Sequence, residues 1–229
     1  GSRPWTDDAA FRPGPEMRSA RSYYAVVSSR GRAVFFGGVS AAGDNSNTTE
    51  VLDTATMSFT AGPDLLTRRS GCAAVQIDAD RVLVVGGFDD GSCLDTTEIF
   101  HLSTLTLTAG PTMQTGRNLC AVVALDTGRV LVVGGSDNDE TALSSTEILN
   151  LDTLAFSPGP TIATPRSGCA VVALDEHRIM IVGGRHDQTV QGGRLNTTEV
   201  FDIRTMAFVP GPSMSSERDG CVAVPVDAQ

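Results

Sequence analysis

The chain has 229 residues, which is enough for one or two domains with a sizeable core. Its formal net charge of −10 argues against non-specific binding to nucleic acid or to an anionic membrane, both of which require a basic face. All 17 basic residues are arginines, so the sequence also excludes lysine chemistry such as a Schiff base.

The beginning of the chain carries no recognisable targeting segment. Residues 1–2, Gly-Ser, resemble the remnant of a cloning site, and we assign residues 3–229 to a single domain. No charged stretch followed by an apolar one opens the chain, so no signal peptide is expected. The longest apolar runs, such as VLVVGG, are too short to span a bilayer.

The first predicted element is a partial strand over residues 9–15, which contains Phe11 and ends at Gly-Pro. Gly-Pro recurs four more times, beginning at residues 62, 110, 159 and 211, and an arginine always follows six residues after the proline. These arginines, which we call the first ladder, are Arg21, Arg69, Arg117, Arg166 and Arg218.

Each of the first four ladder arginines opens a unit that we interpret as four short strands. After Arg69 come the small and β-branched run GCAAVQI, the polar turn DADR and the apolar run VLVVGG. A variable polar loop, a third strand TTEIF and a short fourth strand containing Leu107 complete the unit. Near-continuous apolar runs are typical of strands buried on both faces, and no segment has the long 3.6-residue period of a helix.

The repeat length identifies the architecture. Gly-Gly pairs begin at residues 37, 86, 134 and 183, so successive units are 49, 48 and 49 residues apart. A period of about 49 residues with four strands is typical of a propeller blade, whose small-residue first strand lines the narrow centre. The predicted blades span residues 21–63, 69–111, 117–160 and 166–212, and a partial strand over residues 218–227 follows.

Two further sets of residues repeat in every unit and are expected to serve the frame. The paired glycines let backbones pass closely. They are Gly37, Gly38, Gly86, Gly87, Gly134, Gly135, Gly183 and Gly184. The third strands repeat a glutamate at Glu50, Glu98, Glu147 and Glu199.

With these features the unit resembles a kelch repeat. The resemblance rests on Gly-Gly after an apolar strand, the TTEVLD-type third strand, the aromatic residue of the fourth strand, Gly-Pro with an apolar residue two positions further on, and the arginine. It covers residues 5–229. The chain departs from the family in having Phe or Leu where tryptophan is usual. The resemblance implies an all-β kelch propeller with four full blades and parts of a fifth.

The predicted strands are unequal in number. Five first strands and five fourth strands stand against four second and four third strands. A closed propeller needs equal numbers, because an incomplete blade leaves exposed edges. We therefore expect either a segment of a longer kelch domain or a chain that completes its propeller by self-association.

The first ladder admits two interpretations. Each arginine could be a structural staple that bonds to neighbouring backbone or to a repeated glutamate, as buried arginines normally do. Alternatively, the five arginines could form a ring of guanidinium groups at one mouth of the channel, on the face where the resemblance places partner binding. Such a ring would suit an acidic peptide. A second ladder precedes the second strands and consists of Arg32, Arg81, Arg129 and Arg178.

The variable loops after Gly-Gly break the repeat and are the other binding candidates, because rigid scaffolds commonly carry recognition on their loops. Three of them are acidic and the fourth is longer and basic. The candidate residues are Asp89, Asp90, Asp137, Asp139, Arg185, His186 and Arg194. The competing interpretation is that these loops are solvated turns.

The five cysteines predict no disulfide framework. Cys72, Cys120, Cys169 and Cys221 occupy one repeat position and so lie on different blades, where we interpret them as buried core filler. Cys93 lies in a loop and is the expected exposed thiol. Free thiols favour a reducing compartment such as the cytoplasm.

The sequence predicts neither a metal site nor a catalytic site. Some kelch-like propellers are copper-radical oxidases resembling galactose oxidase, but Tyr23 and Tyr24 are adjacent and the three histidines are dispersed. The acidic stretches DDGS and SDNDE lack the spacing of a calcium-binding loop. No Asp-box, GxSxG or phosphate loop occurs, and we expect no cofactor.

We therefore interpret the chain as a protein–protein interaction module or scaffold that binds a protein or peptide through the loops of one propeller face. Two alternatives remain open. The chain could be the non-catalytic part of a propeller enzyme of oxidase or epimerase type, with its active-site residues elsewhere. It could also be a purely structural or oligomerising module.

Overall fold

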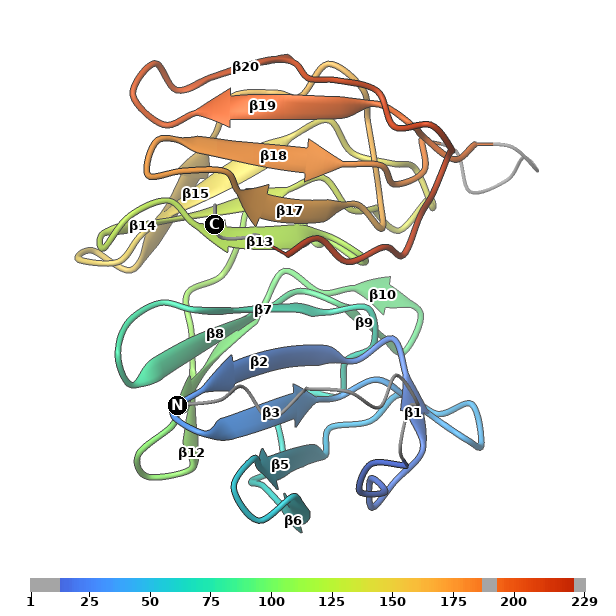
Figure 1. Cartoon of the computed structure of the whole chain (residues 1–229), viewed down its shortest axis with the longest axis vertical. Helices are drawn as coiled ribbons and strands as arrows, with labels where there is room; N and C mark the ends of the chain where they lie inside the picture. Colours follow the sequence, from blue (N-terminus) through green and yellow to red (C-terminus); the bar gives the residue numbers. More distant parts are fainter. Residues whose placement is uncertain (1–12, 187–192, 225–229) are drawn as a thin grey trace, which may run out of the picture.

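The structure is a computed structural model and describes residues 13–186 and 193–224 (Figure 1). Within these residues every regular element is a β-strand. Sixteen of the strands form four antiparallel sheets of four strands each. Within each sheet the strands lie side by side in the order in which they occur along the chain. This arrangement confirms the predicted all-β fold with four-stranded blades.

The four blades follow one another along the chain. The first contains β2 (Ala25–Ser29), β3 (Arg32–Phe36), β5 (Thr49–Asp53) and β6 (Ser58–Ala61). The second contains β7 (Ala73–Gln76), β8 (Arg81–Val85), β11 (Thr97–His101) and β12 (Thr106–Ala109). The third contains β13 (Ala121–Ala124), β14 (Arg129–Val133), β15 (Thr146–Asn150) and β16 (Ala155–Pro158). The fourth contains β17 (Ala170–Ala173), β18 (Arg178–Val182), β19 (Thr198–Asp202) and β20 (Ala207–Pro210).

Two short pairings in the loops were not predicted from the sequence. Strand β1 (Arg21–Ser22) pairs with β4 (Val39–Ser40), and β9 (Phe88–Asp89) pairs with β10 (Ser92–Cys93) in a small hairpin. Each of these strands has two residues, which is too short for an alternation of apolar and polar residues to reveal it in the sequence. They give a defined backbone conformation to one end of the first two blades. We call this end, which carries the variable loops after Gly-Gly, the loop-bearing end.

The predicted partial strands lie only partly within the described residues. Residues 9–12 and 225–227 are outside them. The described portions, residues 13–15 and 218–224, contain no strand. Residues 218–221 nevertheless repeat contacts made at the start of the complete blades. The amide of Gly184 donates to the carbonyl of Arg218 at 2.9 Å, as the amide of Gly87 does to the carbonyl of Arg117 at 2.8 Å.

The hydrophobic core consists of layers between neighbouring blades. In β8, Val82 and Val84 pack toward the first blade with Phe36 and Phe100, whereas Leu83 and Val85 pack toward the third blade. A third cluster joins the third and fourth blades. The central strands are therefore buried on both faces, which explains their unbroken apolar runs.

The first strand of each blade lies near the centre of the assembly. Strand β2 contacts β7, β7 contacts β13, and β13 contacts β17. In Figure 1 these strands lie toward the middle of the molecule, with β6 and β20 at the periphery. Each of these strands begins with alanine, and in the second to fourth blades a buried cysteine directly precedes it, so small side chains allow the close approach of neighbouring blades.

The paired glycines hold adjacent blades together. The amide of Gly135 donates to the carbonyl of Arg166, which begins the next blade, at 2.9 Å. Gly134 has φ +59°, and a Cβ atom there would overlap the same carbonyl oxygen. Both the backbone conformation and the lack of space therefore require glycine.

Three cysteines confirm their predicted place in the core. Cys72, Cys120 and Cys169 are buried, and burial raises the pKa of the Cys72 thiol to about 11 and of the Cys120 and Cys169 thiols to about 12. Two predictions were wrong: Cys93, expected to be exposed, and Cys221, expected to be buried, are both half-buried. Burial raises the pKa of the Cys93 thiol as well. The buried thiols are thus neutral packing groups at physiological pH.

Replacing Gly134 by alanine should cost about 2–4 kcal/mol of unfolding free energy, because it adds both a disfavoured φ and an overlap with the Arg166 carbonyl. Gly91→Ala is the matched control, since Gly91 has φ +77° but no atom within 4 Å of its ideal Cβ. The control should lose only about 1 kcal/mol. Equal losses in urea denaturation would contradict the blade-contact role of Gly134.

Candidate functional site

Three arginines of the first ladder are completely buried. Arg69, Arg117 and Arg166 have 0% relative exposure. Their guanidinium groups form ion pairs with third-strand glutamates of the same blade, at 2.8 Å to Glu98, 3.1 Å to Glu147 and 2.9 Å to Glu199. In the first blade, Arg21 pairs in the same way with Glu50 at 2.7 Å.

The surroundings of Arg117 show how the pair is satisfied. Its Nη1 donates to the carbonyls of Gly134 and Ser145 at 2.8 and 2.9 Å, and its Nη2 donates to Ser145 Oγ at 2.9 Å. Glu147 also accepts the backbone amides of Gln114 and Thr115, at 2.7 and 3.1 Å. The pair thus ties the start of the blade to its second and third strands, with the charges hydrogen-bonded as burial requires.

Of the two interpretations of the first ladder, this geometry does not match the ring of free guanidinium groups around a channel mouth. Arg69, Arg117 and Arg166 have no surface to offer a ligand, and Arg21 is held by Glu50. Arg218 is exposed, and its Nη2 donates to Ser216 Oγ at 2.6 Å. The arrangement is that of the staple interpretation.

The second ladder lies at the opposite end of the strands, in the turns between first and second strands. Arg178 forms an exposed ion pair with Asp175 at 2.6 Å, and Arg129 pairs with Asp126 at 2.7 Å. Backbone and side-chain hydrogen bonds hold the pKa of Asp175 below its ordinary value, the bond from Arg178 contributing most. Exposed pairs of this kind contribute little to stability.

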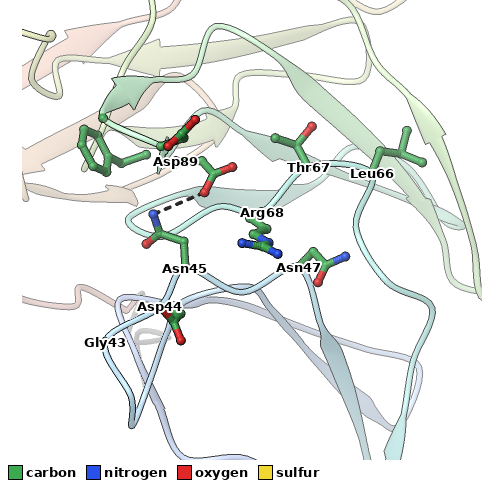
Figure 2. Close-up of a pocket in the computed structure, with 11 residues that line it drawn as sticks. Gly43, Asp44, Asn45, Asn47, Leu66, Thr67, Arg68 and Asp89 are labelled. Carbon is green, nitrogen blue, oxygen red and sulfur yellow. Dashed lines mark hydrogen bonds between the residues drawn. The ribbon is translucent and has the colours of Figure 1, made fainter.

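The loop-bearing end contains a hollow of about 710 Å³ between the first two blades. It is lined by the loop after β4, by the connection that contains Leu66, Thr67 and Arg68, and by the β9–β10 hairpin. Figure 2 shows Arg68 among Asn45, Asn47 and Asp89, and Asn45 Nδ2 donates to Asp89 Oδ1 at 3.5 Å. Among the described residues, Arg68 forms no ion pair.

The predicted acidic loop residues fall into two groups. Asp89 and Asp90 line the 710 Å³ hollow. Asp137 instead stabilises its own loop, because its Oδ1 accepts the amides of Asp139 and Thr141, both at 3.0 Å. Asp139 is exposed. The two loops are joined where the Cys93 amide donates to Asn138 Oδ1 at 2.6 Å.

Two of the predicted basic loop residues, Arg185 and Arg194, border a second hollow of about 460 Å³. Arg194 Nε pairs with Asp219 Oδ1 at 2.6 Å, and Arg185 Nε lies 3.8 Å from Asp219 Oδ2. His186 is exposed, and its amide donates to Gly193 O at 2.9 Å. Asp219 therefore brings Arg185 and Arg194 together.

A third hollow of about 380 Å³ connects the other two. It shares Asn45 and Phe88 with the first and Tyr23 and Leu119 with the second. The sequence interpretation missed Arg68, Tyr23 and Leu119. A signal was available, since each departs from the residue type at its repeat position. Arg68 corresponds to Ala20, Gly116, Pro165 and Glu217.

The described ranges contain no group of three or more His, Cys, Asp or Glu side chains placed to hold a metal ion. His101 lies beside Asp80 at 3.6 Å and His177 beside Glu176 at 3.5 Å, in separate turns. In residues 13–186 and 193–224 there is also no helix that could cross a membrane.

Replacing Arg117 by alanine should lower the unfolding free energy by about 3–5 kcal/mol, because it leaves the carboxylate of Glu147 buried without its counter-charge. Arg178→Ala removes an exposed pair and should cost less than about 1 kcal/mol. Denaturant titration of both variants provides the comparison. Similar small losses in both would show that the first ladder does not staple the blades.

Comparisons with known proteins agree with this architecture. The model of the Kelch motif matches residues 68–114, 117–162 and 165–215, which together make up more than half of the chain. No curated protein matches the sequence. Among solved structures, "Structure of YjhT" is similar with a TM-score of 0.75 and 14% identity, over 90% of this chain and 69% of that one. At this identity the likeness shows the fold alone. The chain therefore belongs to the Kelch motif family and has a kelch-type propeller fold.

Proposed function

We propose that the protein is an interaction module that recognises a partner protein through the loop-bearing end of its blades. Kelch propellers are commonly protein-interaction modules, and rigid blades that present variable loops suit that role. The observation that carries the proposal is the 710 Å³ hollow between the first two blades. Its charged and amide side chains are drawn from segments that break the repeat, whereas the repeated residues serve the frame.

The charge of this end favours a different partner from the one first expected. The expectation of an acidic peptide depended on exposed guanidinium groups, three of which are fully buried. The 710 Å³ hollow has Asp44, Asp89 and Asp90 on its walls against one arginine, Arg68. Opposite charge on the partner would speed association and improve specificity.

A displayed library of random peptides would test the proposal. Peptides selected on the wild-type protein should bind a variant carrying Arg68→Ala, Asp89→Asn and Asp90→Asn at least about tenfold more weakly. The control is Arg178→Ala, which changes a charge at the opposite end of the strands and should leave binding unchanged. Selection of no peptide, or equal binding to both variants, would overturn the assignment of this face.

A second candidate is self-association, favoured by the half-exposed outer face of the first blade. Val26 is 49% exposed there, and Phe35 and Phe59 are only half-buried, with ring centroids 5.5 Å apart. The equivalent residues of the second blade, such as Val84, are fully buried against the first blade. A half-exposed face of the fourth blade, including Met180 and Val182, is complementary by the same repeat.

Light scattering over a range of protein concentrations tests this candidate. The weight-average mass should rise with concentration in the wild type and fall toward the monomer value in Val26→Glu, because a buried unpaired charge opposes the contact. Ala55→Glu places the same charge on an exposed turn and should behave like the wild type. A monomeric mass at every concentration excludes self-association.

A further inference from the structure

Five residues near the centre of the propeller form a chain of backbone hydrogen bonds from blade to blade. Each lies two positions after a first-ladder arginine. The amide of Gly71 donates to Tyr23 O at 2.7 Å, Leu119 to Gly71 at 2.9 Å, Gly168 to Leu119 at 2.8 Å, and Gly220 to Gly168 at 2.9 Å. All five have φ between +53° and +60°. This is the left-handed region, where glycine is the unstrained residue.

Tyr23 and Leu119 do not follow that preference. Three of the five positions hold glycine, yet a tyrosine with φ +53° and a leucine with φ +54° occupy the others. Bulky side chains in this conformation carry a steric cost, and such strain clusters at binding sites. Tyr23 is 64% exposed, so packing against the protein does not compensate for it.

These two side chains stand between two hollows. Both Tyr23 and Leu119 line the 380 Å³ hollow and the 460 Å³ hollow. Val39 and Phe88 add apolar walls to the 380 Å³ hollow. This site therefore combines a concave apolar surface with two strained side chains, of which Tyr23 is exposed and Leu119 is half-buried.

One polar group in the same hollow is left unsatisfied. Asn118 Oδ1 is buried and has no hydrogen-bond partner among the described residues. It lies directly over Gly71, where a Cβ atom would overlap it. An unpaired buried acceptor is costly, and a backbone amide of a bound peptide would satisfy it.

The charged residues around the 380 Å³ hollow determine which ligand residues can lie next to an apolar side chain bound in it. The 380 Å³ hollow opens through Asn45 and Phe88 toward the walls that carry Asp44, Asp89 and Asp90. On its other side, Arg185 and Arg194 are both turned to Asp219. The carboxylates of the first side are thus available to a cationic neighbour of an apolar anchor.

We propose that Tyr23 and Leu119 form an apolar anchor site, which receives one bulky apolar side chain of a peptide segment with basic residues next to it. The inference rests on the proposed function and names the chemistry of the partner. The anchor enters the 380 Å³ hollow, a peptide amide donates to Asn118 Oδ1, and the basic side chain reaches Asp89 and Asp90.

The probe is an acetylated and amidated heptapeptide with one leucine between two arginines in a glycine background. Its binding to ¹⁵N-labelled protein is followed by NMR at low salt. The amides of Gly71 and Gly168 should shift, and the double variant Tyr23→Gly, Leu119→Gly should bind at least about tenfold more weakly. Peptides with serine for leucine, or glutamate for arginine, should also bind more weakly.

The stability of the variants separates an anchor from a structural part. Glycine relieves the left-handed strain, so the double variant should melt at the same or a higher temperature while losing the peptide. A second variant, Tyr23→Asn with Leu119→Asn, gives the same test with a polar residue that tolerates this conformation. Unchanged peptide binding by both variants, or a lower melting temperature in both, overturns the inference.

The displayed-library selection distinguishes failure of this inference from failure of the proposed function. If selected peptides depend on Arg68, Asp89 and Asp90 but the leucine–arginine heptapeptide does not bind, the partner-binding face stands and the anchor is wrong. If the glutamate heptapeptide binds more tightly, the charge assignment is wrong. If neither the library nor the heptapeptide yields binding, both proposals fail.

Discussion

The buried ion pair between a ladder arginine and a third-strand glutamate is the interaction on which the blades depend. A guanidinium removed from water is stable only when its charge and its donors are satisfied together. In the third blade, Arg117 is satisfied by the carboxylate of Glu147, by two backbone carbonyls and by a serine hydroxyl. The backbone carbonyl of Arg117 also accepts the amide of Gly87 from the second blade. The same residue therefore links strands within its own blade and joins that blade to the preceding one.

This constraint explains why so much of the sequence repeats. The glycine pair must leave room for the arginine carbonyl, the glutamate must face the guanidinium, and the second strand must be apolar on both faces. Positions outside these contacts are free to vary. They gather on the end of the blades where the loops after Gly-Gly meet the connections between blades. The division between repeated frame and variable loops is the physical basis for assigning recognition to that end.

Much of the blade structure could be predicted because the same residues recur in every blade. The repeat length, the four strands and the pairing of one arginine with one glutamate per blade all depend on contacts between repeated residues. The hairpin at Phe88–Cys93 could not be predicted in this way, because polar loops have no alternating pattern. The roles of Arg68, Tyr23 and Leu119 depend on which loops of different blades meet in space. The sequence marks them only as exceptions to the repeat.

The site also shows how burial decides between two interpretations of one residue. An arginine repeated near a channel mouth could equally bind an anion or brace the fold, and sequence alone leaves both open. Because the guanidinium groups of Arg69, Arg117 and Arg166 are fully buried, these arginines stabilise the blades and do not contact a ligand. Recognition then falls to side chains that are exposed or strained, and the charge of those side chains is mainly acidic in the first two blades.

A double-mutant cycle between Arg117 and Glu147, measured by equilibrium unfolding, tests the central claim most directly. The single changes Arg117→Met and Glu147→Gln each leave a buried charge without its partner, whereas the double change removes both charges. The account predicts a coupling energy of about 2 kcal/mol or more, with the double variant far less destabilised than the sum of the singles. A coupling energy near zero would contradict it.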